Sequence, residues 1–316
     1  MTLPLVIINP ESAAGRTRNQ WPSIASDLNS HFGPFRPVFT KRAGQARDLA
    51  AEAARKGIGL IVACGGDGTI SEVANGILLS GKDCELGLLP SGTGGDFRRT
   101  LGIPTRPRDA AKILRDGRTR RIDVGRVNYI DDFGGQATRY FVGVASFGMS
   151  AEVIQRVKDE PSEWLPVAAP GWMRGRAAFA SAMLRTAMKA PTTRVVVQLD
   201  DHHEKYLTVT NLCVANARYF GGGMKIAPDA KLDDGRFDVV SVGDLGARKI
   251  LQNSPRVYFG SHLSLSEVGH ALAQKIVVRP VDTGTEVPLE VDGELPGRLP
   301  ATFHVLPGLL RVRCPR

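Results

Sequence analysis

The sequence predicts a two-domain protein that joins an α/β domain to a β-rich domain. Over the first ~125 residues, short apolar runs alternate with helical patterns, an order typical of a parallel sheet with helices on both faces. From Asp123 onwards, strand-like runs separated by Asp-Gly and Gly-rich turns dominate, which is typical of an antiparallel sandwich or barrel. The 316 residues suffice for two domains, and we place the boundary between residues 120 and 140.

The first domain is predicted to alternate strands and helices. The strands are expected at Leu3–Ile8, Val38–Thr40, Leu60–Ala63 and Glu85–Leu89, and the helices at Gln20–Asn29, Gln45–Lys56, Ile70–Leu79, Asp96–Leu101 and Pro107–Arg115. Ligands of parallel sheets bind beyond the carboxyl ends of the strands. Two glycine-rich loops, Gly65–Thr69 and Ser91–Asp96, follow two of these strands and therefore belong to that edge.

The second domain is predicted to be built mainly from strands. They are expected at Tyr140–Val144, Arg194–Leu199, Tyr206–Ala215, Phe237–Val242, Lys275–Pro280, Val287–Val291 and Thr302–Val305, with helical inserts at Met149–Val157 and Arg174–Lys189 and a hairpin tip at Asp131–Gly135. Glu160–Gly175 carries Trp164 and Trp172 among prolines and glycines. This pattern predicts an irregular loop whose tryptophans either pack inside or dock on a membrane.

The loop after the third predicted strand carries the strongest functional signal. Ala63–Asn75 reads A-C-G-G-D-G-T-I-S-E-V-A-N. The glycines let backbone N–H groups approach a ligand, and a helix start attracts anions, so the loop predicts a phosphate seat. Thr69 and Glu72 have the spacing of a capping box. Asp67 lies inside the seat, where a carboxylate suits Mg²⁺ or a hydroxyl group; the alternative is a plain glycine turn before a capped helix.

Two further segments of the first domain fit a nucleotide. Asn9–Ser12 follows the first strand and offers neutral hydrogen bonds, with Arg16 and Arg18 behind it, although an ordinary turn is equally compatible. Ser91–Phe97 is a second glycine loop that leads into a second helix. It is not G-x-G-x-x-G, so a dinucleotide fingerprint is not supported.

Two acidic segments stand out in the second domain. Pro228–Asp238 reads P-D-A-K-L-D-D-G-R-F-D, which is either a solvated acidic turn or a site for a divalent cation. Glu290–Glu294 reads E-V-D-G-E. If the strand continued, its three carboxylates would share one face, whereas the Asp-Gly pair predicts a hairpin turn.

Composition places few limits on the partners. The net charge of +9 is compatible with an anionic membrane surface or a phosphorylated substrate, and no nucleic-acid-binding motif is present, so nucleic acid is not an expected partner. The four cysteines are scattered, and no apolar run reaches the ~18 residues of a membrane span. We expect a cytoplasmic protein that starts to fold at its first residues.

Taken in chain order, these motifs resemble the diacylglycerol kinase catalytic family of lipid kinases, which includes bacterial soluble diacylglycerol kinases and sphingosine and ceramide kinases. The likeness covers nearly the whole chain, through Asn9–Ser12, Thr40–Ala46, Gly65–Asn75, Leu86–Leu101, Arg121–Gly125, Phe141–Met149, Asn216–Lys225, Pro228–Asp238 and Val291–Glu294. The G-G-D-G-T loop alone is less specific, because NAD kinases and phosphofructokinases carry similar loops. The ordered set is specific.

The resemblance implies a three-layer α/β domain with a parallel sheet, residues 1–128, that binds ATP. It implies an antiparallel β-sandwich, residues 129–316, that binds the lipid in the cleft between the domains, although the extreme C-terminus could return to the first domain. Carried over by position, the ATP contacts are Asn9, Ser12, Thr40, Gly66, Asp67, Gly68, Thr69, Glu72 and Thr93. Glu294 is implied as the general base with Asp292 beside it. Asp67, Asp96 and Asp123 are implied around a catalytic Mg²⁺, and Asp234, with carbonyl groups near Lys231 and Arg236, around a structural Mg²⁺.

Two positions differ from the pattern usual in this family. Gly95 stands where the second loop usually has asparagine, and Ala13 stands where the first loop usually has glycine. No carboxylate is lost at either position.

The sequence therefore predicts an ATP- and Mg²⁺-dependent kinase of a neutral lipid with a free hydroxyl group, such as diacylglycerol, ceramide or a sphingoid base. We expect it at the inner face of the membrane as a peripheral protein, and a homodimer is compatible with the sequence. The alternatives are an NAD kinase-like enzyme and a non-catalytic lipid- or nucleotide-binding regulator. Neither alternative requires both the Ser91–Phe97 loop and the carboxylates Asp292 and Glu294.

Overall fold

The computed structural model describes residues 2–92, 94–159, 181–189, 192–282 and 284–316. The chain forms two compact units. The first is Met1–Val124 together with Pro307–Arg316, and the second is Gly125–Leu306. The predicted segment Glu160–Gly175, with its two tryptophans, lies outside the described residues.

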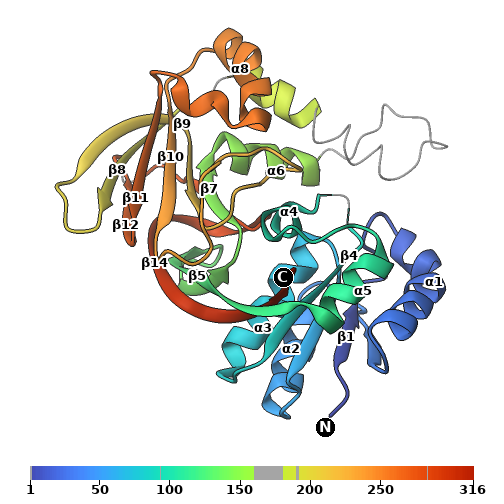
Figure 1. The fold of residues 1–316 in the computed structure, drawn as a ribbon. Coiled ribbons are helices and arrows are strands. Elements are labelled where there is room, and N and C mark those ends of the chain that lie inside the picture. The colour runs from blue at the N-terminus through green and yellow to red at the C-terminus, as the bar shows by residue number, and fades with distance from the viewer. Residues whose placement is uncertain (1, 93, 160–180, 190–191, 283) are drawn as a thin grey trace. The chain divides into compact units, whose positions relative to one another are not determined.

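The first unit alternates strands with helices, which confirms the predicted α/β character. Its strands are β1 (Leu5–Ile8), β2 (Arg36–Phe39), β3 (Leu60–Gly65) and β4 (Glu85–Pro90), and its helices are α1 (Arg16–His31), α2 (Gln45–Arg55), α3 (Asp67–Ser80), α4 (Asp96–Leu101) and α5 (Pro107–Asp116). β1 pairs in parallel with β2 and with β3, and β3 pairs in parallel with β4. Figure 1 shows α1 and α5 on one side of these strands and α2 and α3 on the other.

Apolar runs place this sheet in the core of the first unit. All residues of β1 are buried, as are nearly all of β3 and β4. The end of β14 (Glu294–Cys314) joins the same sheet, because Arg311 and Val312 pair in parallel with Glu85 and Leu86. The buried Glu85 carboxylate accepts two hydrogen bonds from Arg313, at 3.2 and 2.6 Å, and these bonds hold the C-terminal segment to the first unit.

The second unit is built from antiparallel strands. They are β6 (Gln136–Phe141), β7 (Val144–Gly148), β8 (Thr193–Leu199), β9 (Lys205–Ala215), β10 (Phe237–Gly243), β11 (Val268–Ala273), β12 (Lys275–Pro280), β13 (Pro288–Val291), the first part of β14 and the last part of β5 (Arg118–Asp131). The pairing runs from β9 through β7, β13, β14, β12 and β8 and returns to β9. A core that includes Phe141, Phe147, Phe237 and Phe303 fills this ring of strands.

Helices and turns of this unit agree partly with the sequence. α6 (Met149–Asp159) confirms the first helical insert, and residues 181–189 of the second insert are helical. The β5–β6 turn confirms the hairpin tip, where Asp131 N donates to Gly135 O at 2.9 Å. α8 (Ala247–Phe259), the short 3₁₀ helix η1 (Ser261–Ser264) and β11 were not predicted.

The predicted single strand Tyr140–Val144 is wrong. The chain leaves β6 at Phe141 and enters β7 at Val144, so the segment spans the end of one strand and the start of the next. The two residues between them donate their backbone N–H groups to the Asp292 side chain instead of to a neighbouring strand, at 3.1 and 2.9 Å. A long-range carboxylate therefore interrupts a run that is apolar and strand-like in sequence.

All four cysteines are buried and unpaired by disulfides. Within the described ranges, no helix is long and apolar enough to cross a membrane.

Candidate active site

Three loops of the first unit meet beyond the ends of β1, β3 and β4. Asn9 Nδ2 donates to Thr69 Oγ1 at 3.1 Å, which joins the first loop to the second. Ser12 Oγ lies 3.2 Å from Ser91 Oγ, and Thr17 Oγ1 donates to the same Ser91 oxygen at 2.9 Å. Hydroxyl and amide groups from segments far apart in sequence are therefore brought to one edge of the sheet.

Asp67 fastens the two glycine loops to each other. Its Oδ2 accepts the Gly95 N–H group at 2.6 Å, and its Oδ1 accepts the Phe97 N–H group at 3.1 Å. The loops approach closely, since a Cβ atom added to Gly92 would lie 2.3 Å from the Gly66 Cα atom. In this structure the Asp67 carboxylate therefore holds the backbone of the second loop.

The predicted capping box at Thr69 and Glu72 is wrong. α3 begins at Asp67, and Gly66 precedes it without a side-chain cap. The Glu72 oxygens instead accept the N–H groups of Gly44 and Ala46, at 2.9 and 3.0 Å, where α2 begins. The spacing is that of a capping box, but the acceptor serves a neighbouring helix because the unpaired first-turn N–H groups of α2 face it.

The beginning of α3 has the properties of an anion seat. The first N–H groups of a helix have no partner within the helix, and the helix dipole adds partial positive charge there. A Cβ atom on Gly68 would meet no heavy atom within 4 Å, so the backbone at this position borders open space. Thr40 is nearby in the fold, because its N–H group donates to Ile8 O at 2.9 Å beside the first loop, whereas Thr93 lies outside the described residues.

The other two aspartates predicted around the catalytic Mg²⁺ have protein partners of their own. Asp96 Oδ1 accepts a hydrogen bond from Arg99 Nη1 at 2.8 Å. Asp123 is buried and accepts the Gly308 N–H group at 2.8 Å. In the part of the chain that the structure describes, no three Asp, Glu, His or Cys residues are grouped so that they could hold a metal ion by themselves.

The acidic segment Glu290–Glu294 of the second unit forms a hairpin between β13 and β14. Asp292 and Gly293 make the turn with φ of 49° and 86°, the left-handed values that an Asp-Gly turn adopts. The hairpin prediction is confirmed, and the alternative with three carboxylates along one continuous strand is wrong. Asp292 binds the backbone of residues 142 and 143, and Glu294 Oε2 lies 2.8 Å from Arg139 Nη2 with 41% of its side chain exposed.

Arg139 was not predicted as a site residue. It lies on β6, about 150 residues before Glu294, and no local pattern connects them. Glu290 was noted only as one of three clustered acids, but it is the buried member of the hairpin.

The acidic segment Pro228–Asp238 divides into two parts. Asp234 is exposed, and its Oδ1 accepts the Arg236 N–H group at 3.1 Å. Asp238 is buried on β10 and lies 2.7 Å from His270 Nε2 on β11. Burial raises the pKa of the Asp238 carboxyl group, and the His270 hydrogen bond opposes that rise.

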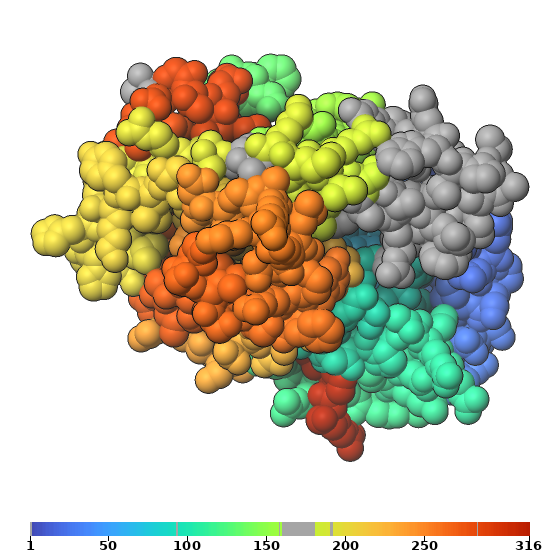
Figure 2. Space-filling view, turned by 90° about the horizontal axis from the view of Figure 1, so that it is seen from above, coloured from blue at the N-terminus to red at the C-terminus, as the bar shows by residue number. Residues whose placement is uncertain are grey.

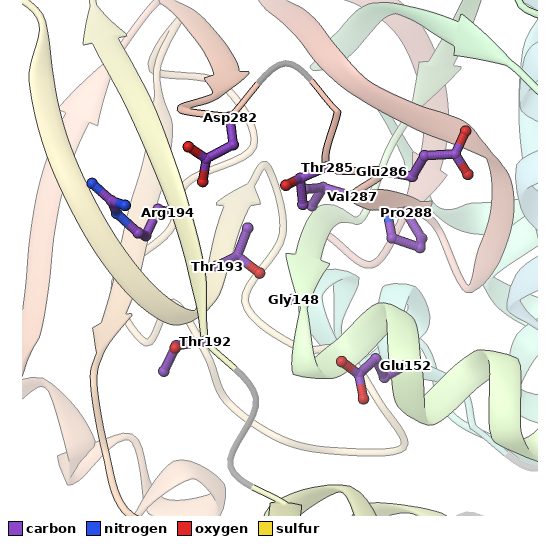
Figure 3. Close-up of a pocket in the computed structure, with 10 residues that line it drawn as sticks. All are labelled: Gly148, Glu152, Thr192, Thr193, Arg194, Asp282, Thr285, Glu286, Val287 and Pro288. Atoms are coloured by element: carbon purple, nitrogen blue, oxygen red, sulfur yellow. The ribbon is translucent and has the colours of Figure 1, made fainter.

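A separate cavity of about 240 Å³ lies in the second unit (Figure 3). Glu152 of α6, Arg194 of β8, and Asp282 and Glu286 before β13 contribute charged groups to its lining. None of the predicted site residues lines it in the described part of the chain, so we do not assign the phosphoryl transfer to it.

Both units match known families in sequence. The diacylglycerol kinase catalytic domain matches residues 4–127, and the YegS C-terminal NAD kinase beta sandwich-like domain matches residues 143–314. These matches define the class of the protein, a lipid kinase. The chain belongs to the diacylglycerol kinase catalytic family.

Relatives extend this likeness over most of the chain. A diacylglycerol kinase from Mycobacterium tuberculosis is 32% identical over 87% of this chain and 82% of its own length. One from Staphylococcus haemolyticus is 28% identical over 98% of this chain and 88% of its own. A solved structure of a diacylglycerol kinase from Bacillus anthracis shares the fold, with a TM-score of 0.71 at 23% identity, covering 99% of this chain and 96% of that one.

The Asp67→Ala variant should stay folded and lose at least a hundredfold in turnover. The substitution removes the acceptor of two backbone hydrogen bonds, each to a charged group and worth about 1.5–3 kcal/mol. Without these bonds the second glycine loop is no longer held in place, so the proposed phosphate seat loses its fixed geometry. Turnover with ATP and lipid, together with urea unfolding, measures both effects.

Asp48→Ala is the control, because Asp48 pairs with Arg42 on the exposed surface of α2. Turnover near that of the unmodified protein in folded Asp67→Ala protein would contradict the role of Asp67.

Proposed function

We propose that this lipid kinase uses ATP and Mg²⁺ to phosphorylate a free hydroxyl group of a neutral lipid. Diacylglycerol is the first candidate, and ceramide or a sphingoid base follows. The observation that carries the proposal is the pair of linked glycine loops at the beginning of α3, where backbone N–H groups and the helix dipole favour phosphate. The proposed nucleotide contacts remain Asn9, Ser12, Thr40, Gly66, Asp67, Gly68, Thr69, Glu72 and Thr93.

We divide the functions between the proposed ATP-binding domain, residues 1–128, with three layers, and the proposed lipid-substrate β-sandwich, residues 129–316. The two compact units and the two matched domains support a division close to this boundary. Since Pro307–Arg316 lies in the first unit, the return of the C-terminus belongs to the proposal. A homodimer is also proposed, and analytical ultracentrifugation of the full chain tests it.

Glu294 is the proposed general base. It removes the proton from the lipid hydroxyl group, whose oxygen then attacks the γ-phosphorus of ATP; the bond from that phosphorus to the bridging oxygen breaks, and ADP leaves. Partial exposure leaves its carboxylate accessible, and the Arg139 contact orients it. Loop N–H groups at α3 stabilise the charge that develops on phosphate, which is the main catalytic need in phosphoryl transfer.

The carboxylates of the first unit could hold a catalytic Mg²⁺ only together with the phosphate oxygens of the nucleotide. Mg²⁺ usually retains several waters and binds one or two carboxylates plus phosphate oxygens, so it does not need a cage of protein ligands. Asp67, Asp96 and Asp123 are the proposed carboxylates around it, acting through water where their oxygens already accept protein hydrogen bonds. The ion would supply positive charge to the transferred phosphoryl group.

A structural Mg²⁺ at Asp234 is proposed on the oxygen chemistry of its turn. The Asp234 carboxylate and the carbonyl groups of Lys231 and Arg236 are hard ligands on an exposed loop. Mg²⁺ that binds only the folded protein stabilises it by mass action. The unmodified protein should therefore melt at a higher temperature with millimolar Mg²⁺, and Asp234→Ala should lose most of that rise.

Asp132→Ala is the matched control, because Asp132 lies in the exposed β5–β6 turn and has no proposed metal. An unchanged Mg²⁺ response in Asp234→Ala protein would show that the segment is only an acidic turn.

Phosphoryl transfer from radiolabelled ATP to a panel of diacylglycerol, ceramide, sphingosine and NAD tests the function. A labelled neutral lipid supports the proposal, whereas labelled NAD supports the NAD kinase-like alternative and no product at all supports a non-catalytic regulator. Glu294→Gln should lower kcat by about 10²–10⁴, the usual contribution of a general base, and leave the Kd for ATP unchanged.

Glu204→Gln serves as the control for that variant, since Glu204 also pairs with an arginine, Arg279, on the surface. Full activity of Glu294→Gln would exclude Glu294 as the base.

We propose that the protein acts in the cytoplasm and docks transiently on the anionic inner face of the membrane. α8 supports this proposal, because its exposed face combines Leu251, Tyr258 and the 80% exposed Phe259 with Arg248 and Arg256. The helix contains no Asp or Glu, and it lies at the surface of the second unit (orange, Figure 2). Apolar side chains beside cations suit an anionic lipid surface.

Replacing Arg248 and Arg256 by Gln should weaken binding to phosphatidylserine-containing vesicles by about tenfold or more, since each basic residue near such a surface contributes about 1 kcal/mol. Tyr258→Ser with Phe259→Ser should weaken it further, and ATP binding should persist in both variants. Vesicle co-sedimentation measures the change. Tyr206→Ser is the control, because Tyr206 is also well exposed, at 71%, but lies on β9; equal losses in all three proteins would contradict a docking role of α8.

A further inference from the structure

Glu290 is a buried carboxyl group beside the turn that carries Asp292 and Glu294. It lies on β13 directly opposite Ser146 of β7, and only 4% of it is exposed. Its Oε1 accepts the Gly293 N–H group at 2.6 Å, and its Oε2 contacts the Ser146 hydroxyl group. One side chain therefore joins the middle of the turn to the neighbouring strand.

A chain of hydroxyl groups continues from Ser146 into the second unit. Ser146 Oγ lies 2.8 Å from Ser150 Oγ, and Ser150 Oγ donates to Asn211 Oδ1 at 2.8 Å. Asn211 Oδ1 also accepts the Ser150 N–H group at 3.0 Å, which identifies this atom as the carbonyl oxygen of the side chain. Asn211 Nδ2 in turn donates to Cys213 Sγ at 3.1 Å.

Counting protons along this chain assigns the protonation state of Glu290. A serine hydroxyl group has one proton to donate. Ser150 gives its proton to Asn211, so Ser146 must donate to Ser150. Ser146 then has no proton left for Glu290, and the remaining contact needs a proton on Glu290 Oε2. An ionised Glu290 would take the Ser146 proton and leave the two serine oxygens facing each other without one.

We propose that protonated Glu290 is a positioning residue that completes this chain and holds the Gly293 amide, and thereby fixes the turn that presents Asp292 and Glu294. The effect on turnover rests on the proposed role of Glu294, whereas the effect on the turn does not. Asp292 binds the backbone between β6 and β7, so the turn is held from both sides. Ionisation of Glu290 places a charge in a buried site, which favours opening of the turn towards water and leaves Glu294 less well placed.

Burial of Glu290 favours its neutral form. Burial raises the pKa of Glu290 to about 7 and Asp292 adds to the rise, whereas the Gly293 N–H group, the charge of Arg139 and the hydrogen bond that Ser146 could donate to an ionised carboxylate oppose it. Cys213 on β9 is buried, and burial raises the pKa of its thiol, so that it stays neutral. α6, which packs against β13, carries Glu152 and Arg156, and Glu294 on β14 is paired with Arg139.

The raised pKa of Glu290 determines how the stability of the fold changes with pH. The carboxyl group loses its proton at a higher pH in the folded chain than in the unfolded chain, where the value is near 4.5. The contribution of Glu290 to folding stability is therefore complete below pH ~4.5 and is lost as the pH rises through about 7. Within that window, the folding equilibrium constant falls by up to about tenfold per pH unit.

Glu290→Gln tests the proposal because an amide group can donate to Ser146 and accept from Gly293 at every pH. In the unmodified protein, hydrogen-exchange protection of the Gly293 amide, corrected for intrinsic exchange, should fall at least tenfold between pH 5 and pH 8.5. In Glu290→Gln it should stay constant. Over the same pH range, kcat should fall more in the unmodified protein than in Glu290→Gln. The KM for ATP should stay unchanged in both proteins.

Glu290→Ala should lose Gly293 protection at all pH values and lower kcat at least tenfold at pH 6. Glu286→Gln is the control, because Glu286 precedes β13 and is 75% exposed at its side chain. Two results overturn the proposal: Gly293 protection that does not depend on pH in the unmodified protein, or Gly293 protection in Glu290→Ala that equals that of the unmodified protein. A matching exchange result with full activity of Glu294→Gln would uphold the positioning of the turn by Glu290 and reject Glu294 as the base.

Discussion

In each unit, the segments that carry the candidate site residues depend on carboxylates that accept backbone N–H groups from glycine-containing loops. Asp67, Glu72 and Asp123 do so in the first unit, and Asp292 does so in the second. Glycine segments have no side chains to fix them and lose much conformational freedom on folding. A hydrogen bond to a charged acceptor is worth about 1.5–3 kcal/mol, enough to hold such a loop in one arrangement. Loop geometry is therefore set by acids that lie far away in sequence.

The hydrogen bonds distinguish acids that hold the backbone in place from an acid that is accessible to a substrate. Both oxygens of Asp67 and both oxygens of Asp292 accept backbone N–H groups. Glu294 is different, because it pairs with the guanidinium group of Arg139 and much of its side chain is open to solvent. A general base needs access to the proton that it removes. Among the acids of the hairpin, access therefore favours Glu294, whereas Asp292 and Glu290 act through the backbone of the turn.

The sequence predicted the class of each unit and nearly every strand of the first, because buried apolar runs between glycine loops are a local signal. It also located the glycine loops and the Asp-Gly hairpin. It could not predict what the carboxylates bind, since the partners of Glu72 and Asp292 lie 26 or more residues away. β11 was missed because Val268–Ala273 contains Gly, His and Ala, which have little preference for strands, and pairing with β10 determines its conformation.

The two departures from the family pattern have opposite physical consequences. Ala13 and Ala14 both adopt left-handed backbone, with φ of 55° and 56°, a region that costs a residue with a Cβ atom about 1–2 kcal/mol. Glycine at position 13 would avoid that cost. The loop adopts this strained conformation next to the hydrogen-bonded side chains of Ser12, Thr17 and Ser91. Gly95 has φ of 69°, where glycine is unstrained and asparagine is tolerated. A Cβ atom there would lie 2.5 Å from Arg98 Nε, so an asparagine in this chain requires Arg98 to move. Gly95 and the position of the Arg98 side chain are therefore coupled, and an asparagine at position 95 requires that side chain to shift.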